Sequence, residues 1–179
     1  MKGTLRYATF RNHCQIMTDQ AQKSLSTLGS TPEIEVFSAI SSLVQRIVIS
    51  CYLGEDFLEH HFDEIHAMVI CLDRDAVSLP SLLLPDWVPH PAARRLWAVR
   101  KRFNDIFEER LKDRASKGWK EEDHVSFTMN NPEVAPIKHL VPTYLLVMIW
   151  IAHISIVPSI AWTIIEASQT FLSFLEVGH

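Results

Sequence analysis

The sequence predicts an all-α fold, because its apolar residues recur every three or four positions through several long segments. Glycine is scarce, with 5 in 179 residues, and this argues against many tight β-turns. Residues 140–165 contain no Asp, Glu, Lys or Arg and are apolar on all sides. A helix of that kind is either the buried central helix of a large protein or a membrane span.

The first predicted helices are separated by helix breakers. Residues 8–27 are polar and compatible with a helix. Thr31 as a cap and Pro32 at the first helical position predict that the next helix covers residues 31–54, with a glycine at its end. A further helix is expected over residues 55–72.

In the rest of the chain, prolines indicate a loop and charged residues indicate a surface helix. Four of the 9 prolines fall within residues 73–91, so we expect this segment to be an extended, partly apolar loop. A long helix is expected over residues 92–116, and its mixed charges, among them Arg110 and Arg114, predict an ordinary surface face. The last helix is expected over residues 134–172.

That last predicted helix contains an internal proline. Pro158 lacks the N–H group that would bond to the carbonyl of Ile154, so a bend is expected there. Such a break beside the small residues Ala152 and Ser155 would make room for a ligand. A kinked helix in which Ser155 bonds back to a carbonyl of its own helix is an equally weighted alternative.

Composition and motifs exclude several classes of function. A net charge of −4 gives no electrostatic basis for nucleic-acid binding. Cys14, Cys51 and Cys71 are odd in number and lack a CxxC spacing, so neither a disulfide framework nor a zinc site is expected. The N-terminus has no long apolar core, so we expect no signal peptide and a reducing, cytosol-facing environment.

A histidine-rich stretch at residues 60–66 is the candidate for a metal site. His60 and Glu64 are four positions apart on a helix, and Asp63 and His66 are three apart. The stretch is not HExxH and has no third ligand nearby, so a solvated helix face is favoured and no metal is predicted.

Three stretches, in this order, resemble the cytochrome P450 family, and in particular its sterol 14-demethylases and related microbial members. Residues 37–57 resemble the helix conventionally called E, with its terminal Leu-Gly-x-x-Phe. Residues 84–95 resemble the F–G loop and the start of helix G, and residues 150–162 resemble the oxygen-binding stretch of helix I. The resemblance implies an incomplete P450 helical domain over residues 1–179, with helices about D to I, ending shortly after the long central helix I. Its parts would be 31–54 (helix E), 55–72 (helix F), 73–91 (F–G loop), 92–116 (helix G) and 134–172 (helix I).

The resemblance implies a haem-thiolate monooxygenase that oxidises an apolar substrate, such as a sterol or a secondary metabolite. Its partners would be O₂, a flavoprotein reductase and the cytosolic surface of the endoplasmic reticulum membrane. Ser155 takes the position of the catalytic alcohol, and Ala152 takes that of the small residue beside the haem. His153, Ile156 and Trp87 are expected to border the substrate pocket.

The sequence also departs from the family. Ile154 stands where the family has an acid, and it cannot relay protons. The Phe-x-x-Gly-x-x-x-Cys-x-Gly loop that supplies the haem thiolate and the Glu-x-x-Arg pair are absent, so this chain is expected to bind no haem and to be inactive alone. Two other interpretations stay open. One is a small single-span or interfacial membrane protein, and the other is a non-catalytic helical interaction module.

Overall fold

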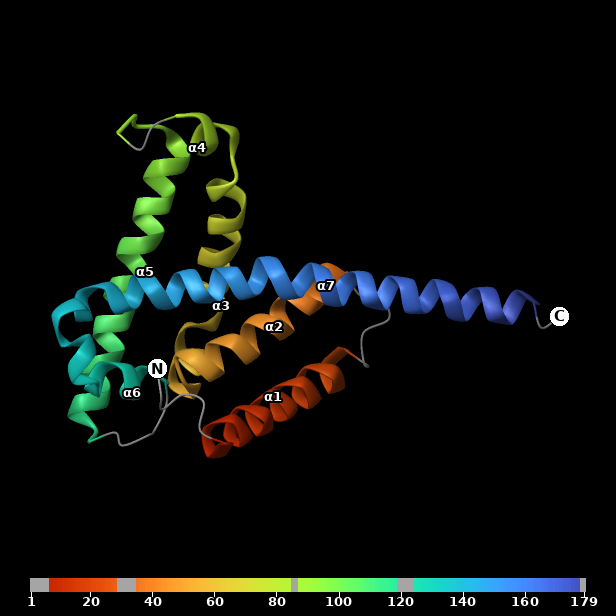
Figure 1. The fold of residues 1–179 in the computed structure, drawn as a ribbon, viewed down its shortest axis with the longest axis horizontal. Helices are drawn as coiled ribbons and strands as arrows, with labels where there is room; N and C mark the ends of the chain where they lie inside the picture. Colours follow the sequence, from red (N-terminus) through yellow and green to blue (C-terminus); the bar gives the residue numbers. More distant parts are fainter. Residues whose placement is uncertain (1–6, 29–34, 85–86, 119–123, 178–179) are drawn as a thin grey trace.

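The computed structural model describes residues 7–28, 35–84, 87–118 and 124–177, and all regular structure in these ranges is helical, which confirms the predicted fold class. Figure 1 shows α2, α3 and α5 gathered around the first part of α7, with α1 beside α2. The C-terminal part of α7 continues past the other helices. The elements are α1 (Tyr7–Leu28), α2 (Val36–Tyr52), α3 (Glu55–Ala76), α4 (Leu79–Leu83), α5 (Pro91–Ser116), α6 (His124–Asn130), the 3₁₀ segment η1 (Pro132–Leu140) and α7 (Val141–Val177).

The ends of α2 are set by one acid and one glycine. The carboxylate of Glu35 accepts hydrogen bonds from two backbone N–H groups of the first turn, which have no partner within the helix. The start predicted at Thr31 and Pro32 lies outside the described residues. Gly54 separates α2 from α3 with a φ of 102°, a conformation that favours glycine, and this confirms the predicted stop.

The hydrophobic core forms where α2, α3 and α5 meet the first part of α7. Helix α2 packs most extensively against α7, and α3 packs most extensively against α5. The rings of Phe57 and Phe107 lie with centroids 5.9 Å apart. Full burial of one such large apolar side chain stabilises the fold by about 1.5–3 kcal/mol. The largest fully buried apolar side chains are Ile49, Leu53, Phe57, Ile65, Phe103, Ile106, Phe107, Leu145 and Ile149.

Two ion pairs hold α3 and α5 as an antiparallel hairpin with α4 at its tip (Figure 1). Arg102 donates to both carboxylate oxygens of Glu64 at 2.6 and 3.0 Å. Nearer the tip, Arg95 donates to both oxygens of Asp75 at 2.6 and 2.9 Å. Hydrogen bonds from Arg95 and Arg74 hold the pKa of Asp75 well below its usual range, so this carboxylate keeps its partners in mild acid.

The segment between these helices is more regular than the sequence predicts. Helix α3 continues to Ala76, past the expected end near residue 72, and the expected loop over residues 73–91 contains the short helix α4. Pro80 is compatible with α4 because it occupies the first turn, where no N–H donor is needed.

The last predicted helix, over residues 134–172, divides into two elements. The segment Pro132–Leu140 forms 3₁₀ turns, and Ile137 within it has non-helical angles of φ −117° and ψ 16°. Pro136 lacks an N–H donor and obstructs the preceding turn, so the α-helix begins only at Val141.

Helix α7 continues as one helix across Pro158, from Val141 to Val177 (Figure 1). The proline therefore does not end the helix, and the bend expected there stays a prediction. Val157 and Ala161 are buried on either side of the proline and hold the helix against the body of the protein. Packing on both sides therefore outweighs the loss of one backbone hydrogen bond.

Candidate functional site

Helix α7 has two different faces, one packed and one open. Its packed face carries Leu145, Ile149, Val157 and Ala161, all buried against the other helices. Its open face leaves a series of large apolar side chains about 40% exposed or more, and a contiguous apolar surface of this kind marks an interaction site. On the open face these side chains are Tyr144, Val147, Ile151, Ile154 and Trp162, whereas the exposed residues Ile156, Ile164 and Phe171 lie on other sides of the helix.

Three of the residues predicted to form a site lie together on this helix. The helical period places Ala152, Ser155 and Ile156 within one arc of its surface. Ala152 is partly buried, whereas Ser155 and Ile156 are exposed. The hydroxyl of Ser155 donates a hydrogen bond to the carbonyl of Ile151 at 2.7 Å, which is the alternative considered for this serine in the sequence.

Trp87 lies apart from these residues. It follows α4 at the tip of the α3–α5 hairpin, and it is 82% exposed. The structure therefore does not bring Trp87 together with Ala152 and Ser155. Other exposed apolar side chains surround Trp87 at the tip of the hairpin. We call this surface the apolar tip, and it consists of Val77, Leu79, Leu82, Leu83 and Trp87.

His153 is buried on the packed face, where a polar chain joins three helices. Its Nδ1 lies 3.1 Å from Nε2 of Gln45 in α2. Oε1 of the same glutamine lies 2.8 Å from Nδ1 of His66 in α3. Burial lowers the pKa of both histidines, so both rings are neutral at pH 7.

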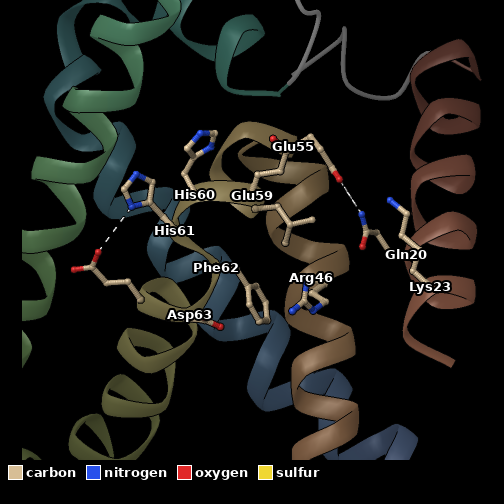
Figure 2. A pocket seen from close by; sticks show the side chains of 11 residues that line it. Gln20, Lys23, Arg46, Glu55, Glu59, His60, His61, Phe62 and Asp63 are labelled. Carbon is tan, nitrogen blue, oxygen red and sulfur yellow. Dashed lines mark hydrogen bonds and ion pairs between the residues drawn. The ribbon is translucent and has the colours of Figure 1, made fainter. Parts of the chain in front are cut away.

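Figure 2 shows a polar pocket of about 520 Å³ between α1, α2 and α3. Some of its polar groups contact each other, as in the His61–Glu64 contact at 3.8 Å and the hydrogen bond from the Gln20 amide to Glu55 at 3.2 Å. No group of three or more His, Cys, Asp or Glu side chains that could hold a metal occurs within the described ranges. The pocket is lined by Gln20, Lys23, Arg46, Glu55, Leu58, Glu59, His60, His61, Phe62, Asp63 and Glu64.

The three cysteines lie on three different helices. Cys14 is exposed on α1. Burial raises the pKa of the Cys51 thiol to about 11. Burial and a contact with Asp75 also raise the pKa of Cys71. Cys51 and Cys71 are therefore protonated thiols at neutral pH and not ready metal ligands.

Comparison with known proteins identifies the family. No family model matches the chain. The cytochrome P450 monooxygenase pyvB of Aspergillus violaceofuscus is 36% identical over 168 residues, which cover 92% of this chain and 34% of the relative. The cytochrome P450 monooxygenase pynD of Aspergillus niger is 32% identical over 168 residues, covering 92% of this chain and 35% of the relative. The chain belongs to the cytochrome P450 family.

This P450 chain is also similar to sterol demethylases at lower identity, which confirms the resemblance found in the sequence. Lanosterol 14-alpha demethylase of Bos taurus is 26% identical over 123 residues, covering 69% of this chain and 24% of the relative. The chain spans about a third of the length of the two Aspergillus relatives. About two thirds of each of these two relatives is therefore not matched by this chain.

The P450 family binds haem, and the described residues fit only one side of that group. Helix α7 carries an exposed hydroxyl, Ser155, and a small, partly buried residue, Ala152, and these are the residue types expected on the oxygen side. The ligand on the other side is a thiolate. Cys51 is buried and protonated, and Cys71 is protonated and donates to Asp75, so neither of these two thiols fits the axial ligand.

The sequence interpretation placed several buried polar residues at the surface. Arg110 and Arg114 are 5% and 6% exposed and lie in the interior, against the predicted surface face of their helix. His66, expected on a solvated face, is partly buried and bonded to Gln45. Gln45 was missed altogether, although a polar residue at helical spacing within an apolar stripe indicates a core position that needs a partner.

Proposed function

We propose that this chain forms the central helices of a haem-thiolate monooxygenase, with α7 in the role of helix I above the haem. In this arrangement α2 is helix E, α3 is helix F, and α5 is helix G. The observation that carries the proposal is the division of α7 into a packed face and an open apolar face, with Ser155 exposed and the partly buried Ala152 one turn away at the edge of the packed face. Haem would supply the oxygen-activating chemistry, and the substrate would be an apolar small molecule oxidised with O₂ and electrons from a flavoprotein reductase.

In this proposal Ser155 is the proton-handling group of the chain. Its hydroxyl donates to the carbonyl of Ile151 and keeps its own lone pairs free to accept a hydrogen bond from a group on the open face. Ile154, its neighbour, has no polar atom in its side chain, so Ser155 acts without an adjacent acid. The 179 residues alone are proposed to bind no thiolate-ligated haem, because the Cys51 thiol is buried and protonated and the Cys71 thiol is protonated and donates to Asp75.

A chimera tests both parts of this proposal. In it, this chain replaces the matching segment of pyvB, and the CO-bound ferrous spectrum reports the axial ligand. We expect a thiolate-type spectrum from the chimera and none from this chain mixed with haem. Ser155→Ala in the chimera should lower product formation by about 100-fold, the low end for a positioned proton-transfer group, with the spectrum unchanged.

Ser159→Ala is the matched control, because Ser159 lies one turn further along α7 and its hydroxyl likewise donates to the carbonyl four residues earlier, at 2.8 Å. This variant should keep most of the activity. Equal losses in the two variants would contradict the role of Ser155. A chimera that folds, as judged by far-UV circular dichroism, yet binds no haem would contradict the proposed family function.

We propose a membrane surface as a further partner, contacted by the apolar tip. The exposed leucine and tryptophan side chains of the tip could contact lipid tails, and Arg74 and Arg95, which lie near the tip, could contact anionic headgroups. The double variant Leu83→Ser with Trp87→Ser should lower binding to anionic phospholipid vesicles by about tenfold, because it removes two apolar anchors. Phe127→Ser, at a 45% exposed residue of α6, is the control, and an equal loss there would contradict the proposal.

A single membrane span is the second candidate for α7. The stretch Pro132–Phe171 is long and apolar enough to cross a membrane. An apolar segment of 18 residues within it has a mean hydropathy of 2.1, but 39% of that segment is buried inside the protein. The packing of Leu145 and Ile149 favours a helix of a folded domain. Alkaline carbonate extraction separates the two, because a spanning chain stays with the membrane and a domain helix is released.

A further inference from the structure

A chain of three hydrogen-bonded side chains crosses the interior beneath the proposed oxygen side of α7. Gln45 is fully buried and His153 is 7% exposed. His66 stacks on the ring of Phe62, with centroids 5.6 Å apart. The three polar residues come from α2, α7 and α3, so the chain ties these helices together at one level.

The amide of Gln45 imposes a specific protonation on the two rings. Its Nε2 group donates to Nδ1 of His153, which must then lack a proton and carry it on Nε2. Its Oε1 atom accepts from Nδ1 of His66, which must then carry the proton on Nδ1. One amide can satisfy both neighbours only if His153 is neutral with its proton on Nε2 and His66 carries a proton on Nδ1. When both rings are neutral, the two histidines therefore hold opposite tautomers.

The charged surroundings agree with neutral rings. Burial is the largest influence on both histidines and lowers the pKa of each. For His66, a charge on His153 and the guanidinium of Arg46 lower the pKa further, and Asp63 raises it. For His153, Asp73 on α3 raises it.

Two arginines of the remaining packed helix, α5, are paired with acids of α3. Helix α5 faces α3 with Arg95 and Arg102, and these bind Asp75 and Glu64. Neither arginine is among the groups that shift the pKa of His66 or His153. The balance therefore favours two uncharged rings at neutral pH.

The geometry points to Gln45 as a positioning residue whose amide, held between neutral His66 and His153, fixes the rotation and axial position of the α7 turn that carries Ala152 and Ser155. His153 directly follows Ala152 and precedes Ser155 by two residues, so its ring cannot be held without holding that turn. We call this group of Gln45, His66 and His153 the clamp, and its existence is inferred from hydrogen bonds within this chain. Its role in oxygen chemistry rests on the proposed function.

Acid should release the clamp. The lowered pKa values of the buried histidines mean that folding favours their neutral forms, so this stabilisation is complete above about pH 6.5 and declines as the pH falls below that value. Protonation of His153 at Nδ1 would place two N–H donors, one from His153 and one from Gln45, opposite each other with no acceptor between them. The hydrogen bond between α2 and α7 would then be lost.

Nitrogen NMR of the ¹⁵N-histidine-labelled chain tests the clamp directly at pH 7.5. The 9 histidines are assigned with the help of His66→Gln and His153→Gln, each of which removes one ring. We expect opposite tautomers at His66 and His153, and we expect Gln45→Met to abolish the difference. The same tautomer at both positions, or no response to Gln45→Met, would overturn the proposal.

Hydrogen exchange of the backbone amides of residues 149–157 separates positioning from simple packing. Glutamine at position 153 keeps an acceptor for Gln45, whereas leucine fills the space and offers none. His153→Leu should speed exchange roughly tenfold at pH 7.5, the size expected for one buried hydrogen bond, and His153→Gln should stay within about twofold of the unmodified chain. Slower or unchanged exchange in His153→Leu would show that only packing matters.

The chimera distinguishes a failure of this inference from a failure of the proposed function. There, Gln45→Met should leave the CO spectrum intact and lower the ratio of product formed to electrons consumed about threefold or more. An unaltered ratio, with the opposite tautomers still observed, would overturn the positioning role alone. Loss of the spectrum in the unmodified chimera would instead overturn the proposed function and leave the tautomer result standing.

Discussion

Replacing Arg114 by methionine is expected to destabilise the chain by about 3–5 kcal/mol, the usual loss when one partner of a buried ion pair is removed. The side chain is 7% exposed and binds Asp56, with Nε 2.8 Å from Oδ2. It also donates to the backbone carbonyl of Leu53 at 2.7 Å, at the end of α2. The variant would leave the Asp56 carboxylate buried with only Arg110 nearby, at 4.0 Å, and would leave the carbonyl without this donor.

Urea unfolding followed by far-UV circular dichroism measures this loss. Lys112→Met is the matched control, because Lys112 lies two residues earlier on the same helix and its side chain is 80% exposed. Its contact with Glu108, at 4.0 Å, is a surface pair worth at most about 1 kcal/mol. Equal destabilisation by the two substitutions would show that burial of Arg114 is not the cause.

Ile149→Ala is expected to cost about 2–5 kcal/mol, because it leaves a cavity in the core between α7 and its neighbours. Ile149 is fully buried on the packed face of α7. The midpoint of urea unfolding should therefore fall clearly. The same substitution at Ile151, two residues further on and 43% exposed, should change the stability by less than about 0.5 kcal/mol.

This comparison also tests the central feature of the proposed site. If Ile151→Ala were as damaging as Ile149→Ala, the open face of α7 would be packed in solution, and Ala152 and Ser155 could not face a haem. The expected difference would instead show that α7 is held from one side only. It would leave the other side available for haem and substrate in a complete P450.

Local sequence patterns were sufficient for much of the fold. Helical spacing of apolar residues in α2 and the stop at Gly54 depend on neighbours within a few positions, so they could be predicted. The order of the family motifs also indicated the P450 relationship that the Aspergillus relatives confirm. That α7 continues as a helix across Pro158 depends on the packing of Val157 and Ala161, which the local sequence does not show.

The sequence by itself determined that this protein is helical, where most helices lie, and to which family it belongs, because those properties follow from local periodicity and local motifs. Only the tertiary structure decided which polar side chains are inside. Arg114 and Asp56 are 58 positions apart, and Gln45 and His153 are 108 apart. A charge or amide can be buried only where a distant helix supplies its partner, and spacing along one helix does not contain that information.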